Sequence, residues 1–237
     1  MLPPVPGPPV YLFGGVVVVR AFDELGGAGF WVGCAIVIVF SLILKLSACA
    51  IQQKVIGERL GQEAWVKAAC GVHTPFIRAV EMILKRPGLD MGKVGILCGG
   101  PDWPTSVLTG LLKCKLSEMM IGTLPMILLI VPTVLTGAFF LKADPMYSTV
   151  GSILFICSLF VCAGFGMYAT YAVQNELEKH PNYLRIKLLK NRELDWIDYK
   201  NTELSKVYYE VNSWEKTSLS LRIIMIIGLL IMNFAMF

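Results

Sequence analysis

The sequence predicts an all-α polytopic membrane protein with four spanning helices, two re-entrant hairpins arranged as an inverted repeat, and a cytoplasmic helical tail. Composition is the first observation behind this class. The 237 residues are 55% hydrophobic and only 16% charged, with a mean hydropathy of +0.64, whereas about 25% of residues are charged in an ordinary soluble domain. The second observation is that the apolar residues gather into runs long enough to cross a hydrocarbon core, which takes about 20 helical residues.

Four apolar runs have the length of a spanning helix. They cover residues 28–50, 119–141, 147–173 and 219–237. Two further runs, residues 3–19 and 94–112, are almost as long, but proline and glycine interrupt them. These interruptions predict elements that enter the membrane without crossing it as one straight helix.

The polar segments fix the predicted topology. Most of the 21 basic residues lie in residues 51–93 and 175–218, so the positive-inside rule places both segments in the cytoplasm. Only two spanning helices lie between these segments. Residues 94–112 must therefore enter and leave on the cytoplasmic face as a re-entrant hairpin.

The tip of this hairpin is the stretch GGPDWPTSVLTG, residues 99–110. Its prolines lack amide donors, and such a break is tolerated within a membrane only where protein or a wet cavity satisfies the freed polar groups. Two interpretations of Asp102 stay open. It lines a polar cavity, or it caps a helix that begins near Thr105. For Lys45, late in the first span, the length of the side chain favours a head group that reaches the membrane interface.

The first interrupted run has the same construction as the second. Five prolines surround Gly7, and Gly14 and Gly15 follow before a run of valines. Because one spanning helix separates it from the cytoplasmic segment 51–93, this hairpin is predicted to enter from the lumenal side. Two hairpins that enter from opposite faces, each followed by a spanning helix, are typical of an inverted repeat whose broken elements meet near the midplane.

The block from Trp65 to Lys85 is predicted to be a pair of interfacial helices that is broken at Pro75. Apolar residues recur on one helical face of this block, while basic residues lie elsewhere.

The motifs of the two interrupted runs resemble the VTT domain of the DedA superfamily, also described as the SNARE-associated Golgi protein family. The resemblance covers about residues 3–172. It rests on PGPPVYLFGG in the first half and, in the second half, on an ordered series of short motifs. That series falls on Pro101, Pro104, Gly110, Leu111, Gly122, Thr123, Pro125 or Pro132, and Gly137.

The resemblance implies a membrane domain over residues 1–174, followed by a polar cytoplasmic segment, residues 175–218, and the last span, residues 219–237. It also implies that the two hairpins face each other. For eukaryotic members of the family it implies movement of phospholipids between leaflets, in the endoplasmic reticulum or the Golgi.

This sequence departs from the family pattern in three places. Relatives carry an arginine just before the first proline of the second hairpin, where this chain has Cys98, with Lys93 as the nearest cation. The first hairpin lacks the carboxylate of bacterial members, which argues against the proton-coupled transport proposed for them, whereas passive scrambling needs no such group. Relatives also have a spanning helix before the first hairpin, which suggests that the sequence is a fragment or a shortened gene model.

The predicted function is therefore phospholipid scrambling through a polar cavity between the hairpins. The predicted lipid path comprises Asp102, Thr105, Ser106, Thr109 and Lys93. The residues predicted to shape the hairpins are Pro6, Gly7, Pro8, Gly14, Gly15, Gly99, Gly100, Pro101, Pro104, Gly110, Gly122, Thr123, Pro125 and Pro132.

Two other functions remain open. One is a membrane-trafficking scaffold that does not transport lipid and binds a cytoplasmic protein through residues 175–218. The other is an ion-coupled secondary transporter. No enzyme or nucleic-acid motif occurs, and seven scattered cysteines without a CxxC pair, with two distant histidines, predict neither a metal site nor a cofactor.

Overall fold

A computed structural model describes residues 7–24, 26, 28–142, 144–185, 192–214 and 216–235, and of residues 183, 185, 192–193 and 229–235 it describes the backbone alone. All regular elements within these described residues are helical. The chain divides into two units, residues 1–187 and 188–237. The domain boundary predicted at residue 174 falls inside a continuous helix, α10 (Pro145–Lys179).

Three helices of the described chain are long and apolar enough to cross a membrane, and they coincide with the first three predicted spans. The first consists of α2 (Gly29–Ile51), the π-helical turn η1 (Gln52–Gly57) and α3 (Glu58–Leu60). The second consists of α8 (Leu116–Thr123), the 3-10 turn η2 (Leu124–Met126) and α9 (Ile127–Phe139). The third is α10. The structure thus supports the prediction of an integral membrane protein.

The first predicted hairpin is wrong over its described residues. Residues 7–19 belong to one unbroken helix, α1 (Gly7–Asp23), and residues 3–6, which include Pro6, lie outside the described residues. Pro8 falls in the first turn of α1, where the helix needs no amide donor. The Gly14–Gly15 pair does not break the helix. A Cβ on Gly15 would lie 2.3 Å from the Val134 carbonyl oxygen, so the glycine lets α9 approach closely.

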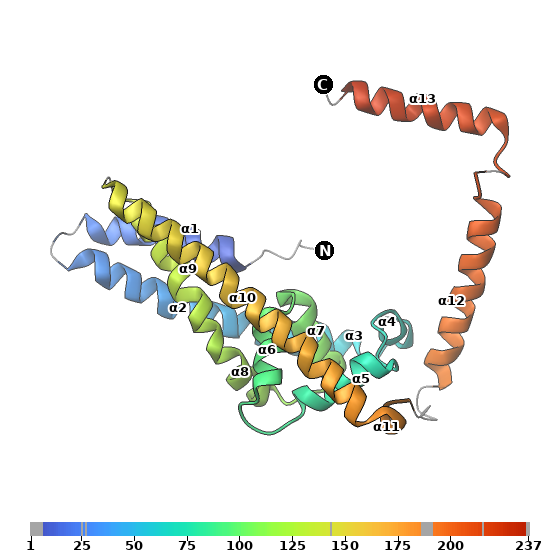
Figure 1. The fold of residues 1–237 in the computed structure, drawn as a ribbon, viewed down its shortest axis with the longest axis horizontal. Coiled ribbons are helices and arrows are strands. Elements are labelled where there is room, and N and C mark those ends of the chain that lie inside the picture. The colour runs from blue at the N-terminus through green and yellow to red at the C-terminus, as the bar shows by residue number, and fades with distance from the viewer. Residues whose placement is uncertain are drawn as a thin grey trace. The chain divides into compact units, whose positions relative to one another are not determined.

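Helices α1, α2, α9 and α10 form a bundle (Figure 1). α1 and α2 make a helical hairpin, and α1 also packs along α9. The apolar core between these helices includes Val19, Val37, Ile130 and Val134. Lys142, just after α9, forms an ion pair with Asp23 at 2.9 Å and lies 4.4 Å from the centroid of the Phe30 ring. These contacts bring Asp23 and Phe30 together with Lys142 at one end of the bundle, which is named here the Lys142 end.

Two short helices, α6 (Met91–Gly99) and α7 (Asp102–Leu111), flank the predicted break at Gly100–Pro101. α6 runs antiparallel to α10, since Gly92 lies beside Ala172 and Gly99 lies beside Gly166. A Cβ on Gly99 would be only 2.3 Å from the Gly166 amide nitrogen. The tip between α6 and α7 therefore reaches the middle part of α10 and abuts its backbone.

α7 leads back from this tip alongside the first long helix. Gly110 crosses the π-helical turn at Gly57, and a Cβ on Gly110 would lie 2.6 Å from the Gly57 Cα atom. The start of α6 and the end of α7 thus lie at the same end of the bundle. This end comprises residues 84–93 and 112–118 together with Glu176, and is named here the Arg86 end.

Helices α4 (Ala64–Ala69), α5 (Pro75–Leu84) and α11 (Pro181–Arg185) complete the first unit. The predicted helix pair with a break at Pro75 is confirmed. The Thr74 hydroxyl accepts a hydrogen bond from the Ile77 amide at 3.3 Å, and Pro75 occupies the first turn of α5. Thr74 is thus the N-cap that starts the second helix of the pair.

The second unit contains α12 (Arg192–Val211) and α13 (Leu219–Ala235). α12 supports the predicted helical tail. α13 has 17 residues and is apolar. It is shorter than the three helices that could cross a membrane, so the fourth span, residues 219–237, stays a prediction.

Candidate functional site

The tip between α6 and α7 places a carboxylate against a lysine from another helix. The ammonium group of Lys45 forms an ion pair with the Asp102 carboxylate. Lys45 lies halfway along the continuous helix Gly29–Leu60, and Asp102 is the first residue of α7. The two charges therefore meet at mid-length in the bundle, far from either end of the long helix.

This pair corrects two expectations. Asp102 does not cap a helix that begins near Thr105, because α7 begins at Asp102 itself and its N-cap, Pro101, makes no side-chain cap bond. Lys45 does not extend to the membrane interface. Its side chain is only 5% exposed, and its ammonium group pairs with the nearby Asp102 carboxylate instead.

The two partners differ in exposure. The Asp102 side chain is 37% exposed, and its neighbours Pro101 and Pro104 are exposed as well. The carboxylate is thus the member of the pair that can be reached from the surface of the bundle, whereas the ammonium group lies behind it. Within membrane segments, ionisable side chains that face the protein interior usually mark a substrate or ion path.

The three predicted hydroxyls of the lipid path are buried within the same helix. The Thr105 hydroxyl donates to the Pro101 carbonyl at 2.8 Å, the Ser106 hydroxyl to the Asp102 carbonyl at 3.1 Å, and the Thr109 hydroxyl to the Ser106 carbonyl at 2.7 Å. The structure therefore does not bring these hydroxyls to the surface beside Asp102. Each satisfies a carbonyl of α7 in the way serine and threonine commonly do in apolar surroundings.

Lys93, the fifth predicted path residue, belongs to a different polar cluster at the Arg86 end. Its side chain is fully buried, and its ammonium group donates to the Gly88 carbonyl at 3.0 Å, to the Arg86 carbonyl, and to Glu118 Oε2 at 3.1 Å. The same carboxylate accepts a hydrogen bond from the Gly88 amide at 3.0 Å. Lys93 thus ties the loop before α6 to α8.

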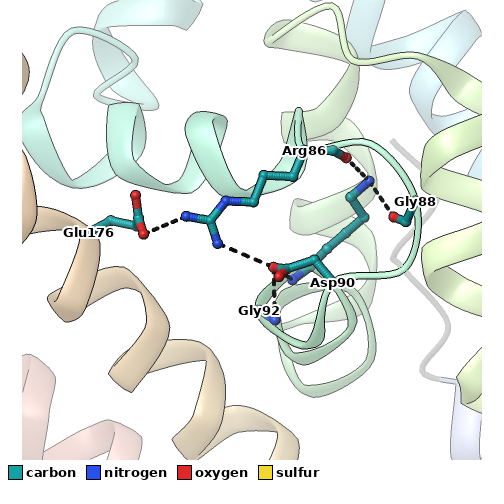
Figure 2. A network of polar contacts seen from close by, with 6 residues as sticks. Arg86, Gly88, Asp90, Gly92 and Glu176 are labelled. Carbon is teal, nitrogen blue, oxygen red and sulfur yellow. Dashed lines mark hydrogen bonds and ion pairs between the residues drawn. The ribbon is translucent and has the colours of Figure 1, made fainter.

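Figure 2 shows how the Arg86 side chain extends this cluster to α10. Its guanidinium group donates to Glu176 at 2.5 Å and lies 3.6 Å from Asp90 Oδ2. The bond to Glu176 raises the pKa of Arg86 above its usual value. Asp90 in turn caps α6, since its carboxylate accepts from the Gly92 amide at 3.1 Å. The cluster of Arg86, Asp90, Lys93, Glu118 and Glu176, named here the Arg86 cluster, joins α6, α8 and α10.

The predicted hairpin residues of the second half lie at interruptions and close contacts. Gly99 is the last residue of α6, Gly100 and Pro101 form the break, and Pro104 lies in the first turn of α7. Pro125 lies in the 3-10 turn that divides α8 from α9, and Pro132 lies inside α9. Thr123 is buried and donates to the Met119 carbonyl at 2.8 Å. A Cβ on Gly122 would come within 2.7 Å of Leu97, so this position packs α8 on α6.

Gln53 was missed from the sequence. Its side chain is fully buried in the π-helical turn, and its amide group donates to the Cys114 carbonyl at 2.7 Å. Its Oε1 atom has no hydrogen-bond partner within the described residues. In the sequence, a polar residue just after an apolar run is typical of the membrane interface. The burial of Gln53 in the π-helical turn is visible only in the structure.

A scan against protein-family models, a search of curated proteins and a search of solved structures found no match to this chain. The resemblance to the VTT domain therefore stays a prediction. Among the described residues, no group of three or more histidine, cysteine or acidic side chains is arranged to hold a metal ion. The site is thus defined by the ion pair and by the break that positions it.

Proposed function

We propose that this protein is a phospholipid scramblase of the endoplasmic reticulum or the Golgi, and that lipid headgroups cross the membrane beside the tip between α6 and α7. In this proposal α6 and α7 form a re-entrant hairpin that enters from the cytoplasm at the Arg86 end. Residues 61–93 and 175–218 are then cytoplasmic and the Lys142 end is lumenal, whereas residues 51–60 continue the first long helix and pack against α7.

The Lys45–Asp102 pair is the observation that carries the proposal. A headgroup that crosses a bilayer has to leave water, and the cost is greatest at mid-depth, where hydrocarbon offers no polar partner. The pair supplies two opposite charges at mid-length in the bundle, and the exposed Asp102 makes one of them accessible from the side. The acyl chains can then stay in lipid while the headgroup moves past the tip.

Two glycine contacts support an inverted repeat in this proposal. Gly15 of α1 abuts α9, the second long helix, and Gly110 of α7 abuts η1 of the first long helix. α7 thus lies against the first long helix, and α1 packs on the second long helix as well as on α2 of its own half. This reciprocal arrangement is what a two-fold relation between the halves would produce.

The test is a dithionite assay on purified protein in liposomes that contain a fluorescent phospholipid. A scramblase makes both leaflets accessible to bleaching, whereas empty liposomes lose only the outer-leaflet signal. We expect Asp102→Asn to slow scrambling several-fold. Asp23→Asn is the matched control, since Asp23 also pairs with a lysine, Lys142, but at the end of the bundle. Bleaching confined to the outer leaflet with the wild-type protein would refute the function.

A trafficking scaffold is the second candidate, because α12 carries large exposed side chains. Trp196, Tyr199 and Tyr209 are 60%, 66% and 74% exposed in the second unit. Aromatic side chains are enriched in protein interfaces. In this case residues 175–218 would bind a cytoplasmic protein, and liposomes with the wild-type protein would bleach only in the outer leaflet.

A further inference from the structure

The Lys45–Asp102 pair presents one positive and one negative charge, and such a pair can distinguish phospholipids by the charges of their headgroups. We infer that Lys45 and Asp102 separate to bind a zwitterionic phospholipid headgroup, with the phosphate on Lys45 and the ammonium group on Asp102. This inference rests on the proposed scramblase function. It adds a substrate class, the zwitterionic phospholipids, and a role for each charge.

The pair is built from two independent segments, which allows it to open. Lys45 belongs to a long continuous helix, and Asp102 to the first turn of a short helix behind a glycine–proline break. Among the described residues, Asp102 is the only charged partner that Lys45 has. Separation therefore requires the loss of one ion pair and of no wider network.

Charge balance explains why a zwitterion suits this site. A buried ion pair loses one partner only at high cost, because the remaining charge is left without compensation. A zwitterion offers an anion to Lys45 and a cation to Asp102, so both charges stay paired throughout the exchange. A lipid with one net negative charge would pair Lys45 and leave Asp102 beside an anion, and an uncharged headgroup would compensate neither.

The exposures of the two side chains fix the order of contact. Asp102 is 37% exposed and Lys45 only 5%, so the terminal ammonium of the headgroup meets Asp102 first. The phosphate, which lies closer to the glycerol, follows toward Lys45.

The experiment compares three acyl-labelled fluorescent lipids in the same dithionite assay. These are phosphatidylcholine, phosphatidylglycerol and glucosylceramide, in phosphatidylcholine vesicles with a minor fraction of phosphatidylglycerol. The wild-type protein should move phosphatidylcholine fastest. The readout is the ratio of the phosphatidylglycerol rate to the phosphatidylcholine rate within one preparation, because this ratio does not depend on how much protein is folded.

Single substitutions should shift this ratio in opposite directions. Asp102→Asn leaves Lys45 alone and should raise the ratio about fivefold, whereas Lys45→Gln leaves Asp102 alone and should lower it about fivefold; each shift corresponds to about 1 kcal/mol in activation free energy. The double variant Lys45→Gln/Asp102→Asn has no unpaired charge, which protects its folding, and should lose the preference for phosphatidylcholine. Asp23→Asn and Lys142→Gln should keep the wild-type ratio.

The outcomes separate the two proposals. If the wild-type protein scrambles lipids but Asp102→Asn and Lys45→Gln slow all three lipids equally, the pair is structural; the inference then fails, while the scramblase function stands. Equal wild-type rates for the three lipids would overturn the inference in the same way. If the wild-type protein moves no lipid, the proposed function fails and the inference fails with it.

Discussion

The two lysines that are buried among the described residues, Lys45 and Lys93, have opposite kinds of surroundings. Lys93, in the Arg86 cluster, is fully buried and has a carboxylate and two backbone carbonyls as acceptors. Lys45, at the tip, has one counter-charge, and that carboxylate is partly exposed. An ammonium group has three protons to donate. The first lysine is therefore saturated and holds helices together, whereas the second keeps capacity for another partner.

The same contrast separates the two ends of the hairpin formed by α6 and α7. At its base, Asp90 and Lys93 fix α6 through the Arg86 cluster to α8 and α10. At its tip, the break is held by glycine packing against α10 and by one ion pair to α2. The base is thus held by several hydrogen bonds and ion pairs, whereas the tip has few. We therefore expect local rearrangements of the hairpin to occur at the tip and not at the base.

The largest effect should come from Lys93→Met. This change removes the three hydrogen bonds that the fully buried ammonium group donates, and at about 1.5 kcal/mol for each charge-assisted bond the loss should be about 4 kcal/mol. Thermal unfolding in detergent measures the loss. The control is Lys85→Met, because Lys85 is about half exposed and pairs only with Glu81 one turn away, a contact that contributes about 0.5 kcal/mol. Equal melting temperatures for the two variants would show that the Arg86 cluster does not hold the base.

A smaller effect is expected where α1 crosses α9. Gly15→Leu places a side chain against the Val134 carbonyl, 2.3 Å from the added Cβ, and such overpacking against backbone should cost about 3 kcal/mol. Gly164→Leu is the matched control in α10, since nothing lies within 4 Å of a Cβ at that position. The comparison uses the midpoint of thermal unfolding of both variants. A Gly15→Leu protein as stable as Gly164→Leu would mean that α1 does not pack on α9 in this way.

The smallest effect, and the one that bears most on the tip, should appear in a double-mutant cycle on the ion pair. Asp102→Leu leaves Lys45 uncompensated and should cost about 2 kcal/mol, less than a deeply buried charge would, because the carboxylate that covers the ammonium group is partly exposed and its removal brings solvent closer to Lys45. Adding Lys45→Met should restore most of that loss, since the unpaired charge is then gone. Unfolding measurements on both single variants and the double variant give the coupling energy. Additive losses would indicate that the two side chains do not interact.

Hydropathy is sufficient to predict the three long helices. Charged residues are costly in hydrocarbon, so helices that span a membrane are confined to uninterrupted apolar runs of the sequence. The break at residues 99–101 was predicted for a similar reason. Two glycines and a proline in succession oppose a continuous helix there. Local chemistry of this kind can be read from a few neighbouring residues.

The partners of Lys45 and Gly15 could not be predicted in the same way. Lys45 and Asp102 lie 57 residues apart, and an isolated lysine in a span is explained equally well by an extended side chain that reaches the interface. The Gly14–Gly15 pair by itself predicts a break, because glycine is a poor helix former. Its role in the structure is to let the backbone of α9 approach closely. α9 is more than a hundred residues away in the sequence, so the residues around Gly15 cannot reveal this contact.

The π-helical turn Gln52–Gly57 determines which side chains of the first long helix share a face. In a regular α-helix, positions 45 and 57 would be rotated about 120° from each other, since each residue advances by about 100°. A π-helical turn takes up one extra residue and reduces that offset to about 20°. Lys45 and Gly57 can then both face α7, one bound to its first residue and the other crossed by Gly110. The single widened turn thus places the Lys45–Asp102 ion pair and the Gly57–Gly110 backbone contact on the same side of the first long helix.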